Sequence, residues 1–299
     1  MNGIGNILSW SFAAILSLIV AGCAPHGNVP TLTAARAGNP VAITFDDLAV
    51  VLSATVDQAG RVDATALAVN LPRLKRQVDA LAGHWPATAH AGDARLAWLC
   101  NARAAWSLWV IAEHLRPLGG RGDAFELPET IGTNVLLDRR FVLDGKPATL
   151  RDIDAELARE DDFRLAATAP CATDLGGKLS RRPFSAEEVR SSLRRRFQDL
   201  IRDGDRVVID HADRRLRVPP ALWRVAGDLP ERYNKRFNTQ EASLATALGP
   251  YLDAAARRRL AGATDYPAAP RRGPAGIVAV RLSPLERRKI FGPCVSCGP

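Results

Sequence analysis

The sequence predicts an α+β fold in which helices dominate, and two observations lead to this class. Helical patterns of apolar residues alternate along the chain with short apolar runs bounded by turn residues, a mixed order that is typical of α+β proteins. The 299 residues are 47% hydrophobic and 24% charged, which is the composition of a soluble globular protein. We therefore expect one mainly helical domain with a buried central helix and short β-hairpins.

The first elements of this domain are helical. Residues 45–52 predict a short helix, and residues 56–63 predict a tight turn into a new segment. Pro72 fits the start of a further helix, because proline is accepted in the first helical turn. Apolar residues recur there every three or four positions, at Leu67, Leu71, Leu74, Val78 and Leu81.

Residues 97–115 form the most apolar long stretch of the domain. Apolar side chains cover nearly every face of this predicted helix, so we expect it to be buried at the centre of the fold. Asn101 and Arg103 then lie inside the protein, where each needs polar partners. They belong either to a structural hydrogen-bond network or to the lining of a pocket.

The second half of the chain predicts a mixture of hairpins and helices. Asp144-Gly145 is a two-residue hairpin signal, and Thr149 with Asp152 has the spacing of a helix cap. The short apolar run 163–169 predicts a buried strand. After it, a Ser185–Glu188 capping box predicts a helix that runs to Ile201 with Arg194–Arg196 facing outward. Residues 207–209 and 216–218 predict a hairpin. A helical stretch at Trp223 and Leu229 and a last helix over 242–260 follow.

The amino terminus predicts export and attachment to a lipid. Residues 7–21 form an uncharged apolar run, too short for a membrane-spanning helix and typical of a signal peptide. Val20-Ala21-Gly22-Cys23 resembles a bacterial lipobox, which implies a lipid on Cys23 and a periplasm-facing protein, with Ala24 favouring the outer membrane. An uncleaved anchor and an unlipidated signal peptide are the alternatives. The predicted organisation is a signal peptide (1–22), a lipid-anchored tether (23–44), a globular domain (45–262) and a basic tail (263–299).

The charge is basic, with a net value of +8 in which arginine far outnumbers lysine. Codon usage of a GC-rich genome explains such a bias, and so does a surface that meets phosphates or carboxylates. Nine basic residues between Arg257 and Lys289 face only Asp265 and Glu286, and they suit anionic envelope components. We expect no nucleic-acid partner, because the chain carries an export signal and no recognisable nucleic-acid-binding module.

Several segments in sequence order resemble the family of the domain of unknown function 547, whose bacterial members are often secreted or lipid-anchored. The segments are Ala97–Ala105, Leu150–Ala155, Cys171, Pro183–Ala186, and Leu222-Trp223 with Asp228-Leu229. The chain departs from the family pattern at several positions. In the first segment, Arg103 stands in place of the family's tyrosine and Ala104 in place of its second asparagine. In the second segment, Asp154-Ala155 stands in place of a Glu-His pair. Ala166 lies at the position of a histidine before the cysteine, and Gly176 lies near the position of a second loop cysteine.

We therefore expect a non-enzymatic binding or envelope-associated protein with a pocket near Asn101, Arg103 and Cys171. The first alternative is a cysteine-dependent hydrolase or transferase, with Cys171 as nucleophile and His114 as its base. The second alternative is a thiol or metal-handling role for the Cys294 and Cys297 tail, whose expected state is a disulfide. We expect neither a cofactor nor a bound metal.

Overall fold

The computed structural model describes residues 43–83, 92–118, 125–143, 145–160, 164–202, 207–271, 275–277 and 279–280. The predictions for the signal peptide, Cys23, nearly all of the tether, Cys294 and Cys297 lie outside these ranges. Helices dominate and the strands form small sheets, so the α+β class is confirmed. Within the described ranges, no helix combines the length and the apolar character needed to cross a membrane.

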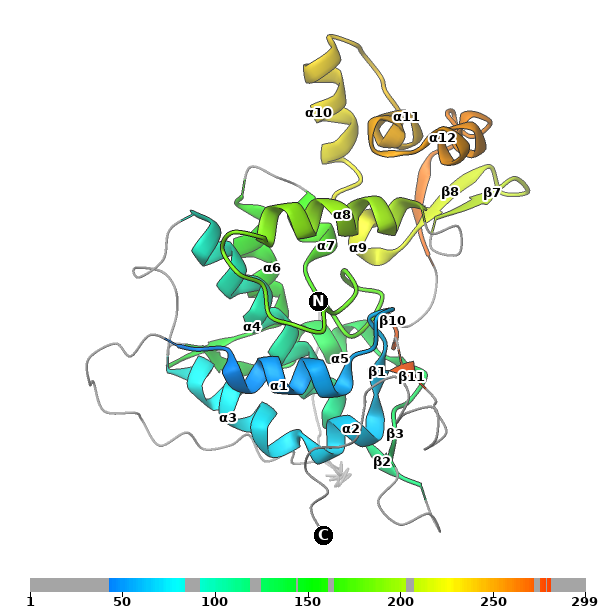
Figure 1. Ribbon diagram of the computed structural model, residues 1–299. Coiled ribbons are helices and arrows are strands. Elements are labelled where there is room, and N and C mark those ends of the chain that lie inside the picture. The colour runs from blue at the N-terminus through cyan, green and yellow to red at the C-terminus, as the bar shows by residue number, and fades with distance from the viewer. Residues whose placement is uncertain are drawn as a thin grey trace, which may run out of the picture. The chain divides into compact units, whose positions relative to one another are not determined.

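The larger hydrophobic core surrounds α4 (Gly92–Ala112), which is buried along most of its length. This confirms the predicted central helix, although α4 begins and ends a few residues earlier than the sequence pattern. The helices that contact it are α2 (Ala64–Val69), α3 (Leu71–Ala82), α5 (Thr133–Leu137), α6 (Leu150–Ala158) and α8 (Val189–Arg202), and α1 (Asp46–Thr55) packs against α2 and α3 (Figure 1). Pro72 lies in the first turn of α3, as predicted.

Local signals account for the region between α5 and α6. Strands β5 (Phe141–Leu143) and β6 (Lys146–Ala148) pair in antiparallel register and confirm the predicted hairpin. Thr149 then caps α6: its side chain accepts from the Asp152 backbone, and the Asp152 carboxylate accepts from the Thr149 backbone in return. This is a complete capping box, which satisfies two backbone donors at the start of the helix.

Two short strand pairs join distant parts of the chain: β1 (Val62–Asp63) with β11 (Ala279–Val280), and β4 (Thr130–Ile131) with β10 (Ala275–Gly276). A third pair, β2 (Arg116–Pro117) with β3 (Phe125–Glu126), is local and antiparallel. The sequence pattern placed the end of the globular domain at residue 262. Strands β10 and β11 come from beyond that point, so the described part of the expected tail pairs with the folded domain.

A second hydrophobic core continues from the first through α8 (Val189–Arg202). Val189 and Leu193 belong to the larger core, whereas Phe197, Leu200 and Ile201 belong to the second. The three-stranded sheet of β7 (Val208–Asp210), β8 (Arg215–Val218) and β9 (Ala268–Pro270) confirms the predicted hairpin and adds a parallel strand. The helices here are α9 (Pro220–Trp223), α10 (Asp228–Phe237), α11 (Leu244–Leu248), the 3₁₀ helix η1 (Gly249–Tyr251) and α12 (Ala254–Ala261).

Two predicted elements are wrong, each for a local reason. The expected strand over 163–169 is the helix α7 (Arg164–Thr168), which the sequence Arg-Leu-Ala-Ala-Thr favours because alanine is the best helix former. The expected single helix over 242–260 is divided into α11, η1 and α12. Pro250 cannot continue a helix, and Asp253 starts the next one by accepting from the Ala256 backbone.

Ser185 and Glu188 precede α8 without forming the start of the helix. Residues 186–188 form a turn, and α8 begins only at Val189, whose backbone N–H donates to the Ser185 carbonyl. The predicted apolar face of this helix is confirmed, because Leu193, Phe197 and Leu200 are all buried.

Candidate functional site

A tight turn between α1 and β1 forms one wall of the candidate site. The Asp57 carboxylate accepts from the backbone of Ala59 and Arg61, both at 2.9 Å, and also pairs with the Arg61 guanidinium. Gly60 has φ +78°, and a Cβ there would lie 2.7 Å from the Cβ of Lys178. Glycine at this position therefore lets the turn approach the Lys178 loop closely.

The Cys171 loop provides a second wall. Its two ends are joined by hydrogen bonds of 2.8 Å from the Cys171 N–H to the Gly177 carbonyl and from the Gly177 N–H to the Ala169 carbonyl. A Cβ on Gly177 would lie 2.2 Å from the Thr168 carbonyl oxygen. Glycine is therefore required for the loop to close against the end of α7.

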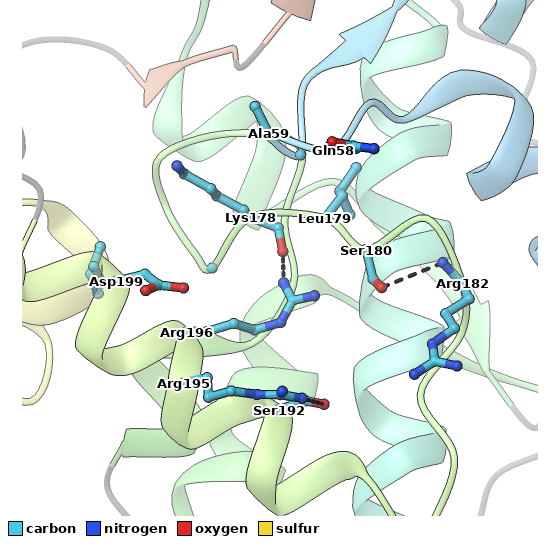
Figure 2. Close-up of a pocket in the computed structure, with 13 residues that line it drawn as sticks. Gln58, Ala59, Lys178, Leu179, Ser180, Arg182, Ser192, Arg195, Arg196 and Asp199 are labelled. Atoms are coloured by element: carbon cyan, nitrogen blue, oxygen red, sulfur yellow. Dashed lines mark hydrogen bonds between the residues drawn. The ribbon is translucent and has the colours of Figure 1, made fainter. Parts of the chain in front are cut away.

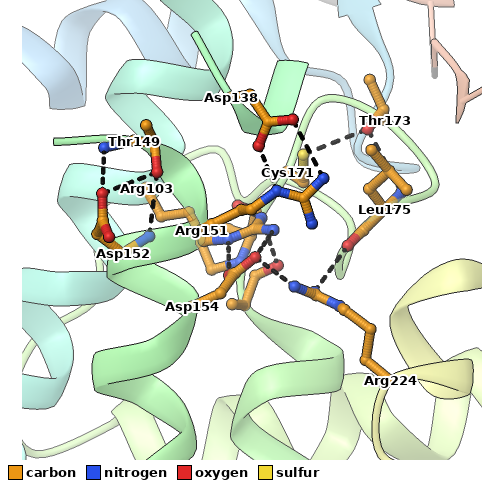
Figure 3. Close-up of polar contacts among 12 residues, drawn as sticks. Arg103, Asp138, Thr149, Arg151, Asp152, Asp154, Cys171, Thr173, Leu175 and Arg224 are labelled. Carbon is orange, nitrogen blue, oxygen red and sulfur yellow. Dashed lines mark hydrogen bonds and ion pairs between the residues drawn. The ribbon is translucent and has the colours of Figure 1, made fainter. Parts of the chain in front are cut away.

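Arg103 holds this loop from inside the protein (Figure 3). Its Nε donates to Asp154 Oδ1 at 2.6 Å, and its Nη1 donates to the Pro170 carbonyl at 2.8 Å and to the Ala169 carbonyl at 3.3 Å. The side chain is 0% exposed. A buried arginine is stable only with such partners, so the predicted need for them is confirmed.

Asp154 lies between two guanidinium groups. It pairs with Arg103 and with Arg224, and Arg224 also donates to the Leu175 carbonyl at 3.2 Å (Figure 3). Burial by itself would raise the pKa of Asp154, but the two cations outweigh it and hold that pKa below its ordinary value. The carboxylate therefore stays ionised, and it links α4, α6 and the segment after α9.

Asn101 connects α4 to the segment before α8. Its side-chain amide donates to the Phe184 carbonyl at 3.0 Å, and its side-chain oxygen accepts from the Phe184 N–H at 2.8 Å. The Phe184 ring in turn lies beneath the Arg196 guanidinium, 4.9 Å from the ring centre. Asn101 thus holds the backbone of the residue whose ring contacts the Arg196 guanidinium.

These walls enclose a pocket of about 320 Å³, here called the basic pocket (Figure 2). It lies between the Gly60 turn, residues 177–182 and the side of α8. Its lining carries one carboxylate, Asp199, against four cations. The cations are Lys178, Arg182, Arg195 and Arg196.

The cations of the basic pocket have few partners of opposite charge. Arg182 pairs with Glu188 at 2.7 Å, outside the pocket lining. Arg196 donates to the Lys178 carbonyl, and among the described residues no carboxylate bonds to it. Burial lowers the pKa of Arg196 from the ordinary arginine value, which is the effect expected of a cation deprived of water. An anion placed in the pocket would therefore meet a guanidinium to which no described carboxylate is bonded.

The three predicted binding residues do not line the basic pocket, so their predicted contact with a ligand is not met there. Asn101, Arg103 and Cys171 are 1%, 0% and 1% exposed, so none offers a surface to a ligand. Their polar groups are instead bonded within the protein, because α4 is buried where it carries Asn101 and Arg103, and Cys171 lies in the buried loop beside it. They support the basic pocket indirectly: Asn101 through Phe184, and Arg103 and Cys171 through the loop that ends at Gly177.

His114 and Cys171 have different hydrogen-bond partners. The His114 Nδ1 lies 2.8 Å from the Val110 carbonyl, and the Cys171 thiol lies 3.3 Å from the Thr173 hydroxyl. The other described histidine, His211, contacts Tyr266. Among the described residues no hydrogen bond joins Cys171 to a histidine, and the pairing of Cys171 with His114 stays a prediction.

Cys100 and Cys171 are both buried free thiols. Burial raises the pKa of Cys100 to about 12, which keeps it protonated and unreactive at neutral pH. In the part of the chain that the structure describes, no group of three or more His, Cys, Asp or Glu side chains could hold a metal ion.

The sequence did not single out the residues that line the basic pocket. Arg194–Arg196 were expected only as outward-facing residues of the helix that ends at Ile201, and Lys178 was not singled out. A signal was present, because three successive arginines on an amphipathic helix place cations on both edges of its polar face. Which of them meets another segment depends on the fold.

Comparison with known proteins does not extend this description. The chain matches no protein-family model, no curated protein and no solved structure.

Proposed function

We propose that the chain is a non-enzymatic binding protein that holds a small phosphate- or carboxylate-bearing ligand in the basic pocket. The observation that carries this proposal is the charge of the lining, with four cations against one carboxylate around about 320 Å³. Cavities from about 300 Å³ upward accommodate small-molecule ligands. Arginine is well suited to this role, since its planar fork can donate two parallel hydrogen bonds to one oxyanion.

The environment of Cys171 supports binding rather than hydrolysis. A cysteine nucleophile needs a thiolate that is accessible to substrate and a neighbouring base. Cys171 is 1% exposed and contacts the Thr173 hydroxyl, and neither described histidine bonds to it. The proposal for the Cys294 and Cys297 tail lies outside the described residues and stays a prediction.

We also propose that the chain is a divergent relative of the domain of unknown function 547. The segments that carry this resemblance meet around α4. Arg103 of the first bonds to Asp154 of the second and to the Pro170 carbonyl beside Cys171. Asn101 of the first bonds to Phe184 of the fourth. Such contacts between segments are the arrangement expected if the motifs share one ancestral core.

The proposed location is the bacterial cell envelope, with the chain held on the membrane by a lipid on Cys23 and facing the periplasm. The lipobox-like sequence before Cys23 supports this proposal. Mass spectrometry of the protein recovered from cell membranes tests it directly. A mature chain that begins at an acylated Cys23 is the expected result, whereas an unmodified, intact amino terminus contradicts it.

Titration of the full chain with inorganic phosphate tests the binding proposal. Arg196→Met keeps the aliphatic stem over Phe184 and removes the charge. We expect at least about a ten-fold loss of affinity, because a hydrogen bond to a charged group contributes about 1.5–3 kcal/mol. Arg195→Ala is also expected to weaken binding.

Arg202→Ala is the matched control for this titration. Arg202 is an exposed arginine on the same helix, but it does not line the basic pocket. Its replacement is expected to leave phosphate affinity within about two-fold. Absence of phosphate binding, or an equal loss in the Arg202 and Arg196 variants, would contradict the proposal.

A further inference from the structure

Two cavities meet at the end of α10, on the opposite side of α8 from the basic pocket. The first measures about 850 Å³ and the second about 440 Å³. They share the side chains of Tyr233, Phe237 and Pro250. In Figure 1, α10, α11 and α12 lie together on the side of α8 that is away from α1 and α3. A ligand large enough could therefore occupy both cavities at once.

The first cavity, here called the polar cavity, is strongly cationic. Its lining holds a single acidic residue, Glu231, against six cations: Arg164, Arg190, Arg194, Arg232, Lys235 and Arg236.

Part of this cationic charge has no carboxylate partner among the described residues. Arg190 pairs with Asp93 and Glu160. Among the residues that the structure describes, neither Arg194 nor Lys235 pairs with a carboxylate. An excess of unpaired cations around a cavity favours an anionic ligand.

The second cavity, here called the apolar cavity, has a different lining. Leu252 and Leu260 are buried side chains on its wall, together with alanine and glycine residues of α11, η1 and α12. Its single charged residue is Arg257, whose guanidinium donates to the Leu252 carbonyl at 3.1 Å. It has no acidic lining residue, so it suits a hydrocarbon group.

Two aromatic rings form the boundary between the cavities. Tyr233 and Phe237 lie one turn apart on α10, with ring centres 4.6 Å apart. Phe237 is 46% exposed, and Leu229 is the one fully buried residue of α10. Tyr233 also packs against the second hydrophobic core, whereas Phe237 is not part of that core. Rings of this kind suit the junction between the polar and apolar parts of an amphiphilic ligand.

The link between α10 and α11 fixes this boundary. Asn238 ends α10 in the left-handed conformation with φ 50°. The Asn234 side chain accepts from the Thr239 hydroxyl at 3.0 Å and from the Ala242 N–H at 3.2 Å. These bonds hold the two helices together, so that both cavities exist without a ligand.

We propose that this paired site binds one molecule of an anionic phospholipid, with its phosphate in the polar cavity and an acyl chain in the apolar cavity. The excess of cations selects a negatively charged head group, and the adjoining apolar lining selects a ligand with a hydrocarbon chain. The site lies apart from the basic pocket and does not depend on the function proposed for it. Two neighbouring arginines of α8 can test the two sites separately, because Arg194 lines the polar cavity and Arg195 lines the basic pocket.

The experiment uses the full chain carrying Cys23→Ser, so that no acyl group attached to the protein competes, and Arg196→Met, so that the basic pocket is weakened as a second site for soluble phosphates. The protein is titrated with dihexanoyl phosphatidylglycerol, dihexanoyl phosphatidylcholine and glycerol 3-phosphate, each as a soluble monomer. We expect phosphatidylglycerol to bind about ten-fold more tightly than either of the others. Equal affinity for phosphatidylcholine would remove the role of the cations, and equal affinity for glycerol 3-phosphate would remove the role of the apolar cavity. Either result overturns the proposal.

Two variants locate the binding site. Arg194→Ala is expected to weaken phosphatidylglycerol binding about five-fold, since a basic residue near an anionic lipid contributes about that factor. Phe237→Ala is expected to weaken phosphatidylglycerol binding while leaving glycerol 3-phosphate unchanged. Arg195→Ala, the same change one residue along α8, is expected to leave phosphatidylglycerol affinity unchanged. All three residues are exposed, and circular dichroism confirms that each variant is folded. Equal losses for the Arg194 and Arg195 variants would refute the site.

Discussion

Replacement of Arg103 by methionine tests the structural centre of the fold. Methionine fills much of the same space but cannot donate hydrogen bonds. The change removes two bonds to the Asp154 carboxylate, at 2.6 and 3.3 Å, and two to the carbonyls of Ala169 and Pro170. Asp154 is then left in the interior with Arg224 as its remaining guanidinium partner in this cluster.

The expected cost follows from burial. The Arg103 and Asp154 side chains are 0% and 8% exposed, so water cannot replace the lost partner. Removing one member of a buried ion pair lowers the free energy of unfolding by about 3–5 kcal/mol. This is a large share of the total, because folded proteins are stable by about 5–15 kcal/mol.

Arg151→Met is the matched control for Arg103→Met. Arg151 pairs with Asp138 at the surface, where the two side chains are 50% and 46% exposed. An exposed pair contributes about 0–1 kcal/mol, so this variant should remain close to the wild type in stability.

Urea unfolding followed by tryptophan fluorescence measures both variants, since Trp98 and Trp106 lie in the buried α4. A loss below about 1 kcal/mol for Arg103→Met, or equal losses for the two variants, would refute the reasoning.

Two further predictions concern titration and reactivity. The pKa of Asp154 is lowered in the folded protein. Its contribution to the free energy of unfolding is therefore complete above about pH 4, which is the ordinary pKa of an aspartate. This contribution is lost as the pH falls through the lowered pKa. In acid urea titrations, the stability difference between wild type and Asp154→Asn should therefore shrink, and a constant difference would contradict the assigned shift. Burial raises the pKa of Cys100 to about 12, so this thiol should react with maleimide in the native protein only as fast as the protein unfolds. Mass spectrometry of the labelled peptides measures this rate. Rapid labelling of Cys100 in the native protein would contradict its burial.

The elements that could be predicted are those whose signals act over a few residues. The Thr149 capping box, the hairpin before it and the start of α3 at Pro72 follow from side chains that bond to or restrict their own neighbouring backbone. The apolar faces of α4 predicted its burial for a similar reason. Local signals failed at residues 164–168, because a short apolar run fits a strand and a helix equally well.

By itself, the sequence determined that Asn101 and Arg103 would be buried and would need partners. Only the tertiary structure decided which partners they have: Asp154 lies 51 residues from Arg103, and Phe184 lies 83 residues from Asn101. The same holds for Arg194 and Arg195, which are neighbours in the chain but face different cavities. The reason is physical, because backbone preferences are set by neighbouring residues, whereas the environment of a side chain is set by whichever distant segment packs against it.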